Sequence, residues 1–535
     1  MKKISPIVLA ALLCSQVFAQ NLNPEVEVTN DYEARLSGIR KSVLPMAVPD
    51  SLKNFRTSVD YSVFETTYKG AYDFRPYAIN VTPEAGVYDG RSFYLRAGAG
   101  YSFHPVLQAV FSPDSKGRLY NTSHLDFSGY GGVYHSAGAA GDYSGHDYGI
   151  GAGTSLSWRM PRLQTGVEAL YHGIFTKDCD LSSVFNDFSV TGKLGSTDPS
   201  FRIPFELSVT LAHAQDDAGA GLGTISENSY LLDGSVYAFR RGNFSAGASV
   251  HTQGSFLNAA LPGSLSRFSL LLTHLTPGVV FDNGPVRVSA GLRIGIGDKF
   301  AVYPDITARL GVGAGLLEIY GGLTGGPEAY DYSAIKGMNH WFNYGYLQEF
   351  KTGEEKIGAR LGVRGSISSR VQYDLSGGYV DHGNALLDGL SSDYPGGVQC
   401  AAYYADFSEF FGKLSLAWVS DSFNLGAGLL YRKTDLEASD TYLGVPAFSM
   451  EVTAVYNWNH RLYAGLRAKA QTPRSSLVWQ DKGFVDLGLY SEYGITQSLS
   501  LWVQAGNLLN QRITLYPTHI PGGINFTAGI SLKLG

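Results

Sequence analysis

Nine lysine and arginine residues occupy alternate positions within otherwise apolar runs of the sequence. In the run from Pro285 to Ile296, Arg287 and Arg293 stand between apolar neighbours. Because strand side chains alternate with a period of two, the apolar residues of such runs face one way and the basic residues face the other. A basic arc on the wall of a pore would concentrate anions and speed their passage. The nine residues are Arg96, Arg287, Arg293, Arg309, Lys356, Arg360, Arg364, Arg467 and Lys469.

The same basic arc has a second interpretation. Acidic residues share the predicted inward faces, among them Glu168, Glu206, Glu318, Asp486 and Glu492. Pairing with these acids, or with an inserted N-terminal segment, would keep the interior polar without selecting anions. The net charge of −6 does not decide between the two interpretations, because it sums loops and interior.

The aromatic stretch from Asn339 to Tyr344 is a second candidate site. It lies far from the short turns on either side, which predicts an extracellular loop. Exposed rings there would suit binding of a sugar or a protein partner. Alternatively, the rings fold inward and pack on one another. The candidate residues are His340, Trp341, Phe342 and Tyr344.

Residue patterns typical of catalysis or metal binding are missing from the sequence. It has no Gly-x-Ser-x-Gly elbow between a strand and a helix and no His-Glu-x-x-His. His124, His135, His146 and His172 lack close metal-ligand spacing. The basic residues are too dispersed for a nucleic-acid patch. We therefore expect no catalysis, no cofactor, no metal site and no nucleic-acid partner.

Long stretches alternate apolar with small or polar residues at a period of two. Residues 285–296, 356–364 and 461–471 alternate throughout, and residues 163–172 do so with Leu170 as the exception. Several stretches run to roughly nine or more residues, the length that a tilted strand needs to cross a bilayer. Strands of soluble β-sandwiches are usually about 5 to 6 residues long. We therefore predict an all-β fold, a transmembrane antiparallel β-barrel.

The N-terminus fits export. Lys2 and Lys3 precede an apolar core and a small-residue cleavage site at 17–19, which predicts a signal peptide over residues 1–19. Cys14 would suit lipidation, but Leu13 stands where a small residue is expected. The chain is thus expected to reach the cell outer membrane of a Gram-negative bacterium through a cleaved signal peptide.

The C-terminus reads as the closing strand of such a barrel. Apolar residues alternate with small or polar ones from Thr527 to Leu534. Gly529, Leu532 and Leu534 fit the spacing by which the barrel-assembly machinery recognises closing strands for insertion, although Leu534 and Gly535 replace the usual terminal aromatic residue. That machinery and outer-membrane lipid are the partners this pattern predicts.

Short polar turns divide the region from 91 to 535 into strand pairs. The gaps after Pro161 and Gly284 are about twice as long as the shorter spans, so each should contain one more turn. The count is then about 22 strands, with a range of about 18 to 26. The segment from Tyr120 to Tyr148, rich in Gly, Ser, Tyr and His, reads as a surface loop. The turns are His104-Pro105, Met160-Pro161, 240–243, 282–284, 368–369, 420–422, 457–460 and 496–498.

Residues 20–90 differ from the barrel region. Prolines interrupt a polar, mixed-charge sequence there, and no clean alternation appears. We expect a periplasmic or lumen-inserted extension, either a flexible tether or an ordered plug.

The end of the chain resembles the last hairpin of TonB-dependent receptors. The residues concerned are Ala505–Asn510, Tyr516-Pro517, Gly522-Gly523 and the strand through Gly529. Members of that family are outer-membrane importers with 22-stranded barrels, a plugged lumen and a short box that docks an energy-transducing partner. Residues 20–90 contain neither a recognisable full plug domain nor such a box. The resemblance, of Bacteroidetes type, thus implies a receptor-like barrel, and the departure from the family pattern argues against energised import.

The expected function is passage or binding of a solute at the cell surface. The alternative is a non-conducting structural or accessory subunit of an outer-membrane complex, with a periplasmic or outer-membrane protein as its partner. Cys179 and Cys400, both in predicted extracellular loops, are either bonded to each other or two separate thiols. The sequence names neither the solute, the ligand nor the oligomeric state.

Overall fold

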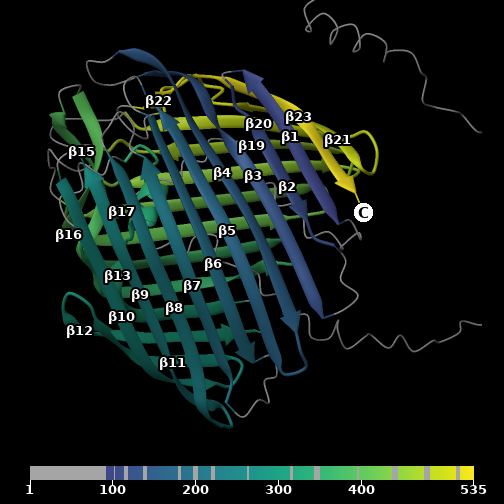
Figure 1. Cartoon of the computed structure of the whole chain (residues 1–535). Coiled ribbons are helices and arrows are strands. Elements are labelled where there is room, and N and C mark those ends of the chain that lie inside the picture. The colour runs from purple at the N-terminus through teal and green to yellow at the C-terminus, as the bar shows by residue number, and fades with distance from the viewer. Residues whose placement is uncertain are drawn as a thin grey trace, which may run out of the picture. The chain divides into compact units, whose positions relative to one another are not determined.

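The computed structural model is a closed antiparallel β-barrel of 22 strands, as predicted (Figure 1). It describes residues 92–101, 103–113, 118–135, 141–178, 182–196, 203–217, 223–261, 264–313, 317–342, 350–394, 397–436, 444–474, 482–513 and 519–534. The predicted signal peptide and the extension over 20–90 lie outside this part of the chain. Within it, no helix is long and apolar enough to cross a membrane.

Consecutive strands pair with one another around the barrel. The first half comprises β1 (Phe93–Tyr101), β2 (Val106–Phe111), β3 (Leu119–His135), β4 (Asp142–Arg159), β5 (Leu163–Lys177), β6 (Ser182–Ser196), β7 (Phe205–Asp217), β8 (Thr224–Arg241), β9 (Phe244–Leu261), β10 (Ser264–Asp282) and β11 (Val286–Ile296). The second half comprises β12 (Phe300–Val312), β13 (Leu317–Ala329), β14 (Thr352–Ser368), β15 (Val371–Tyr394), β16 (Gly397–Val419), β17 (Phe423–Thr434), β18 (Phe448–Trp458), β19 (Leu462–Gln471), β20 (Phe484–Gly494), β21 (Leu499–Gly506) and β23 (Asn525–Leu534). A two-residue strand, β22 (Ile520–Pro521), pairs with β3, and the helix α3 (Tyr332–Met338) lies between β13 and β14.

The barrel closes where the last strand meets the first. In this seam β23 pairs antiparallel with β1, from Phe93 opposite Leu534 to Tyr101 opposite Phe526. A Cβ atom on Gly529 would lie 2.0 Å from the carbonyl oxygen of Ala97 and 2.6 Å from the Trp502 ring. Glycine is therefore required at this position for the strands and the ring to approach so closely.

The two ends of the barrel differ in their connections. At one end, which we call the turn end, tight turns such as Asn459-His460 join the strands, with positive φ angles of 51° and 53°. Such a two-residue turn matches the twist of the flanking strands. The opposite end, the loop end, carries the long connection 330–351 with α3. In bacterial outer-membrane barrels the short turns are periplasmic and the long loops extracellular, so the loop end faces outward.

Two rings of exposed aromatic side chains mark the membrane on the outer surface. On β16, Phe410 and Trp418 stand eight positions apart. On β18, Phe448 and Tyr456 have the same spacing, which corresponds to about 20 Å of tilted strand and agrees with the apolar band of such barrels. The loop-end ring includes Tyr101, Phe188, Phe256, Phe300, Phe410, Tyr431, Phe448 and Phe526, and the turn-end ring includes Phe111, Trp158, Phe239, Phe244, Trp418, Tyr456, Trp458 and Tyr493.

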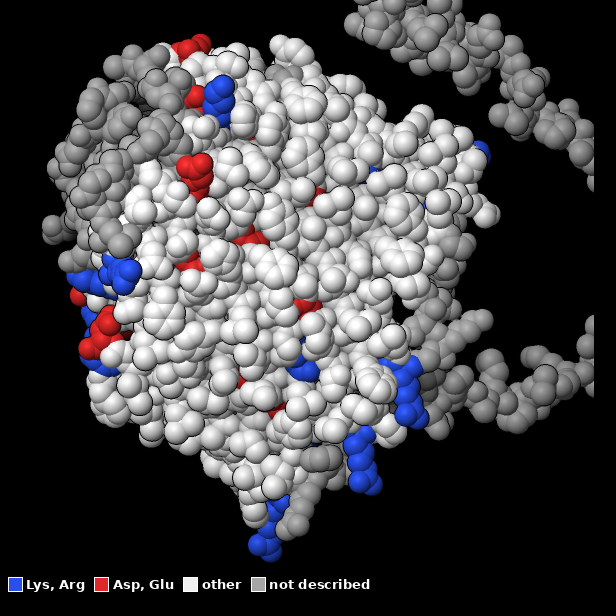
Figure 2. All heavy atoms as spheres, viewed as in Figure 1, with Lys and Arg blue, Asp and Glu red and all other residues white. Residues whose placement is uncertain are grey.

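The outer face between these rings is largely uncharged. Figure 2 shows a face that is mostly white, with scattered small patches of Asp and Glu and with protruding Lys and Arg toward its lower edge. Several strands continue well beyond the loop-end ring, the longest being β15 with 24 residues and β16 with 23. About 9 to 11 residues suffice to cross the bilayer, so the upper part of these strands forms a wall outside the membrane.

The structure confirms the two hidden turns and corrects two other predictions. The additional turns fall at 197–204, between β6 and β7, and at 313–316, between β12 and β13. His104-Pro105 joins β1 to β2 at the loop end, because a proline interrupts strand pairing equally well at either end. Most of the segment from Tyr120 to Tyr148 belongs to β3 and β4. Its loop-like composition reflects a polar, glycine-rich lumen face.

Candidate functional site in the lumen and its mouth

The predicted basic arc lies on the lumen wall, and most of its members pair with carboxylates. Arg364 contacts Glu318, its register partner on the neighbouring strand, at 2.5 Å. Arg467 contacts Glu451 at 2.9 Å. The other ion pairs are Arg360–Glu355 at 3.2 Å, Lys356–Asp406 at 3.4 Å, Arg293–Asp305 at 3.6 Å, and both Arg287 and Arg309 with Asp282 at 3.8 Å.

The remaining two cations also lie beside compatible groups. The Arg96 guanidinium stands 4.2 Å from the centre of the Trp502 ring and 5.2 Å from that of Tyr490, which are cation–π distances. Lys469 faces Glu451 on one side and Asp486 on the other in the strand register. The wall is therefore polar and largely charge-balanced. Anion preference stays a prediction.

The segment formed by residues 331–342, in the connection between β13 and β14, enters the mouth of the barrel. We call it the mouth segment. Asp331 caps α3 by accepting a hydrogen bond from the Ala334 amide at 2.8 Å. The helix ends at Met338, and the chain continues through His340 to Phe342.

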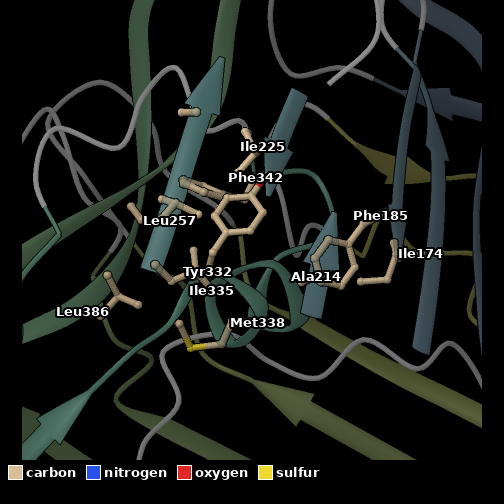
Figure 3. Packing of buried hydrophobic residues seen from close by; sticks show 12 residues of the cluster. Ile174, Phe185, Ala214, Ile225, Leu257, Tyr332, Ile335, Met338, Phe342 and Leu386 are labelled. Atoms are coloured by element: carbon tan, nitrogen blue, oxygen red, sulfur yellow. The ribbon is translucent and has the colours of Figure 1, made fainter. Parts of the chain in front are cut away.

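One side of the mouth segment is part of a hydrophobic core with the barrel wall (Figure 3). Tyr332 and Ile335 are almost completely buried there. Relative to Phe188, Phe256 and Phe410 of the loop-end ring, the wall residues lie nearer the loop end, on the same strand or on the strand paired with it. This core is therefore outside the membrane. It comprises Ile174, Phe185, Ala214, Ile225, Leu257, Ala259, Leu386 and Ala402 from the wall, with Tyr332, Ile335, Met338 and Phe342 from the mouth segment.

A buried glutamate on β8 binds the first turn of α3. Glu227 accepts hydrogen bonds from the Tyr332 amide at 2.9 Å and the Ser333 amide at 3.0 Å, and the Ser255 hydroxyl also donates to it. Burial, and secondarily the charge of Asp331, raises the pKa of Glu227 to about 6. The same carboxylate therefore satisfies amides that the helix leaves unpaired.

A buried ion pair holds the middle of the mouth segment. The Lys336 ammonium lies 3.1 Å from Asp216 on β7, and both side chains are nearly inaccessible, at 3% and 2% exposure. It also donates to the Ser183 hydroxyl and to the Phe342 carbonyl, each at 3.1 Å. All three ammonium protons thus have an acceptor.

The far end of the mouth segment contacts β3 and β4. His340 Nδ1 lies 2.8 Å from Asp147 on β4. The Trp341 ring stacks on His519 with a centroid separation of 3.8 Å and contacts Tyr134 edge to face. The mouth segment therefore spans from β6–β9 to β3 and β4.

The structure places the aromatic candidates inside the mouth. Trp341 and Phe342 are buried, at 9% and 2% exposure, and His340 is half-buried. Tyr344 lies outside the described residues. Trp341 and Phe342 therefore pack inward, which was the alternative prediction for this stretch. Binding of a surface ligand by this loop stays a prediction.

The predicted insertion residues occupy the closing strand. Leu534 is exposed on the outer surface, and Leu532 has the same strand parity. Gly529 lies beneath Trp502, whose indole nitrogen donates to the Ile530 carbonyl at 3.1 Å. Recognition of this strand by assembly machinery stays a prediction.

Other chemistry is sparse in the described part of the chain. No group of three or more His, Cys, Asp or Glu residues there could hold a metal ion. A cavity of about 10 Å³, lined by residues including Met338, Leu387 and Asp388, has room for about one water molecule. Cys400 is buried in β16, and Cys179 lies outside the described residues.

The fold is a 22-stranded antiparallel β-barrel, and solved structures with a similar fold are transporters and receptors. The copper transporter OprC has a TM-score of 0.60 at 14% identity, over 82% of this chain and 79% of that chain. A mutant of the ferric enterobactin receptor PfeA from Pseudomonas aeruginosa has 0.61 at 10%, over 82% and 80%. The siderophore receptor PirA from Acinetobacter baumannii has 0.61 at 11%, over 82% and 79%.

These likenesses confirm the fold, and the outer-membrane location stays a prediction. No family model and no curated protein matches the sequence. Whether residues 20–90 form a plug stays a prediction, because they lie outside the described part of the chain. The sequence did not reveal Asp216, Glu227 or Ser183 as site residues, because nothing local distinguishes them from other polar residues on strands.

Proposed function

We propose that the barrel passes a solute across the outer membrane and that the mouth segment bars its extracellular end. The observation that supports this most is the charge-balanced polar wall. Ion pairs such as Arg364–Glu318 line a barrel whose 22 strands enclose more space than wall side chains fill. Such an interior suits a hydrated solute, and no reaction is part of the proposal.

The proposal includes a weak charge preference. Seven of the nine cations in the basic arc have a carboxylate within 4 Å. Paired charges leave little net field along the pathway, so we expect a reversal potential near zero in a salt gradient. A reversal potential that indicates strong anion selectivity would instead support the anion preference predicted from the sequence.

A second candidate function is a non-conducting accessory subunit. The mouth segment favours it, because it packs against β5–β9 and also against β15 and β16 across the barrel, with residues as buried as Ile335 and Trp341. In that case residues 20–90 would bind a periplasmic partner or fill the lumen.

Conductance in planar bilayers tests both candidates. The mature chain, a form lacking residues 20–90 and the Lys336→Ala variant would be compared. Larger conductance steps in Lys336→Ala support passage barred by the mouth segment. Steps that appear only without residues 20–90 identify that extension as the barrier. The absence of conductance in all three forms, with the barrel folded, favours the accessory subunit.

A further inference from the structure

The Lys336 ammonium occupies a complete binding site. Its three acceptors are Asp216 Oδ2, Ser183 Oγ and the Phe342 carbonyl, each at 3.1 Å. Two of these acceptors belong to the barrel wall. They also bind each other, since the Ser183 hydroxyl donates to the second carboxylate oxygen of Asp216 at 2.7 Å. The wall half of the site is therefore oriented by its own hydrogen bond.

The mouth segment brings the positive charge, and the wall holds the negative charge. If the segment left, Asp216 would lose Lys336 and the Tyr332 hydroxyl, and Glu227 would lose both backbone amides. Asp147 would lose His340. The opened mouth would then present carboxylates from three neighbouring regions of the wall, which attract cations.

A buried ion pair contributes little net free energy to holding two segments together. Its desolvation cost consumes much of the attraction, and well-packed apolar residues of similar size often hold as well or better. An ammonium group from elsewhere can reproduce the contacts of Lys336, however, whereas it cannot replace apolar packing. The arrangement thus suits exchange.

We propose that Asp216 and Ser183 form an ammonium site in the mouth, that Lys336 fills it as an internal ligand, and that the amine of a solute displaces Lys336 to open the mouth. The class of ligand is a primary amine. The identification of that ligand as a transported solute rests on the proposed passage through the lumen. The site itself does not depend on it.

Chemical rescue tests the site directly. In a Cys179→Ala, Cys400→Ala background, Ile335→Cys places a thiol on the buried side of the mouth segment, so its labelling rate reports undocking. Adding Lys336→Ala should raise that rate at least about tenfold, because removing one partner of a buried pair is strongly destabilising. Ethylammonium chloride should then lower the rate toward the original value. Tetramethylammonium, which has no N–H donor, should not.

Two further variants make the result specific. Asp216→Asn combined with Lys336→Ala should lose the response to ethylammonium. Lys336→Met combined with Asp216→Leu should dock by apolar contact, label slowly and ignore ethylammonium. In the chain that retains Lys336, ethylammonium should accelerate labelling as it competes with the internal ligand.

Failure of ethylammonium to slow labelling of the folded Lys336→Ala variant would overturn the site. An equal effect of tetramethylammonium would also overturn it, since the contacts would then not be hydrogen bonds. Labelling does not require a conducting pore. Rescue in a barrel that stays silent in bilayers would therefore keep the ammonium site and refute passage.

Discussion

The ion pairs of the lumen wall and the ion pair of the mouth use the same groups in different settings. Arg364 and Glu318 are register partners on adjacent strands and remain partly exposed, at 27% and 24%. Lys336 and Asp216 are buried and join a connecting segment to a strand with which it forms no sheet. In the wall the hydrogen bonds between strand backbones fix the positions of Arg364 and Glu318, and their ion pair adds little to that geometry. In the mouth the charges fix the position of the segment.

The largest effect is expected for Asp216→Ala, which leaves Lys336 buried without its counter-charge. We expect the mouth segment to lose about 3–5 kcal/mol of docking free energy, the cost of breaking a buried pair from one side. The labelling rate of Ile335→Cys measures it. Lys336→Met with Asp216→Leu is the control. Slow labelling in Asp216→Ala alone would show that the mouth ion pair, like the wall pairs, does not fix the position of its segment.

Glu227→Ala should have the next largest effect. It removes the acceptor of the Tyr332 and Ser333 amides, and a buried donor left without a partner costs about 1–3 kcal/mol. Faster proteolysis within 330–351 would reveal the undocked segment. Ser333→Ala, which removes only a hydroxyl contact, is the matched control and should change the cleavage rate much less.

Docking of the mouth segment should weaken as pH rises from about 5 to 8. Burial raises the pKa of Glu227 to about 6 from an ordinary 4.5, and burial raises that of Asp388, beside Asn339, to about 7. The docked state therefore binds these protons more tightly, and that stabilisation is lost as pH rises through about 6 to 7. Asp187, which faces Asp331, shifts in the same direction. His519, whose pKa is lowered by burial, opposes the trend toward low pH.

The rate of Ile335→Cys labelling, corrected for thiolate fraction with an unfolded control, follows this pH dependence. Glu227→Gln should remove the part of this dependence near pH 6, because the amide cannot ionise, and leave the part near pH 7 that Asp388 contributes, while Lys336 and Asp216 remain in place. Docking that strengthens with pH would contradict the assignment of these carboxylates.

The smallest effect is expected for Arg364→Gln in the wall. The partly exposed pair with Glu318 should contribute within about 1 kcal/mol to barrel stability, as exposed pairs do. Urea unfolding in detergent measures it, with Arg467→Gln as a second wall variant. A loss as large as that of Asp216→Ala would show that wall pairs also fix structure.

Much of the fold could be predicted because it repeats every two residues. Alternation around Arg287 and Arg293 gave strands, and turn spacing gave the strand number and both hidden turns. The prediction failed for Tyr120–Tyr148, since composition alone does not separate a polar lumen face from a loop.

The site was less predictable for a physical reason. Asp216 and Tyr332 are 116 positions apart, and Glu227 and Tyr332 are 105 apart, so no local pattern joins them. The aromatic stretch around Trp341 did indicate an unusual loop. Its inward packing depends on wall residues such as Phe185 and Leu257, which the sequence presents only as ordinary strand residues.

The most direct test compares single-channel conductance of the mature chain with that of Lys336→Ala, each with and without residues 20–90. The account predicts larger open steps in Lys336→Ala than in the parent within at least one of these backgrounds, and suppression of that difference by ethylammonium. Identical conductance of parent and variant in both backgrounds, with Ile335→Cys labelled rapidly in the variant, would contradict the claim that the mouth segment bars the lumen.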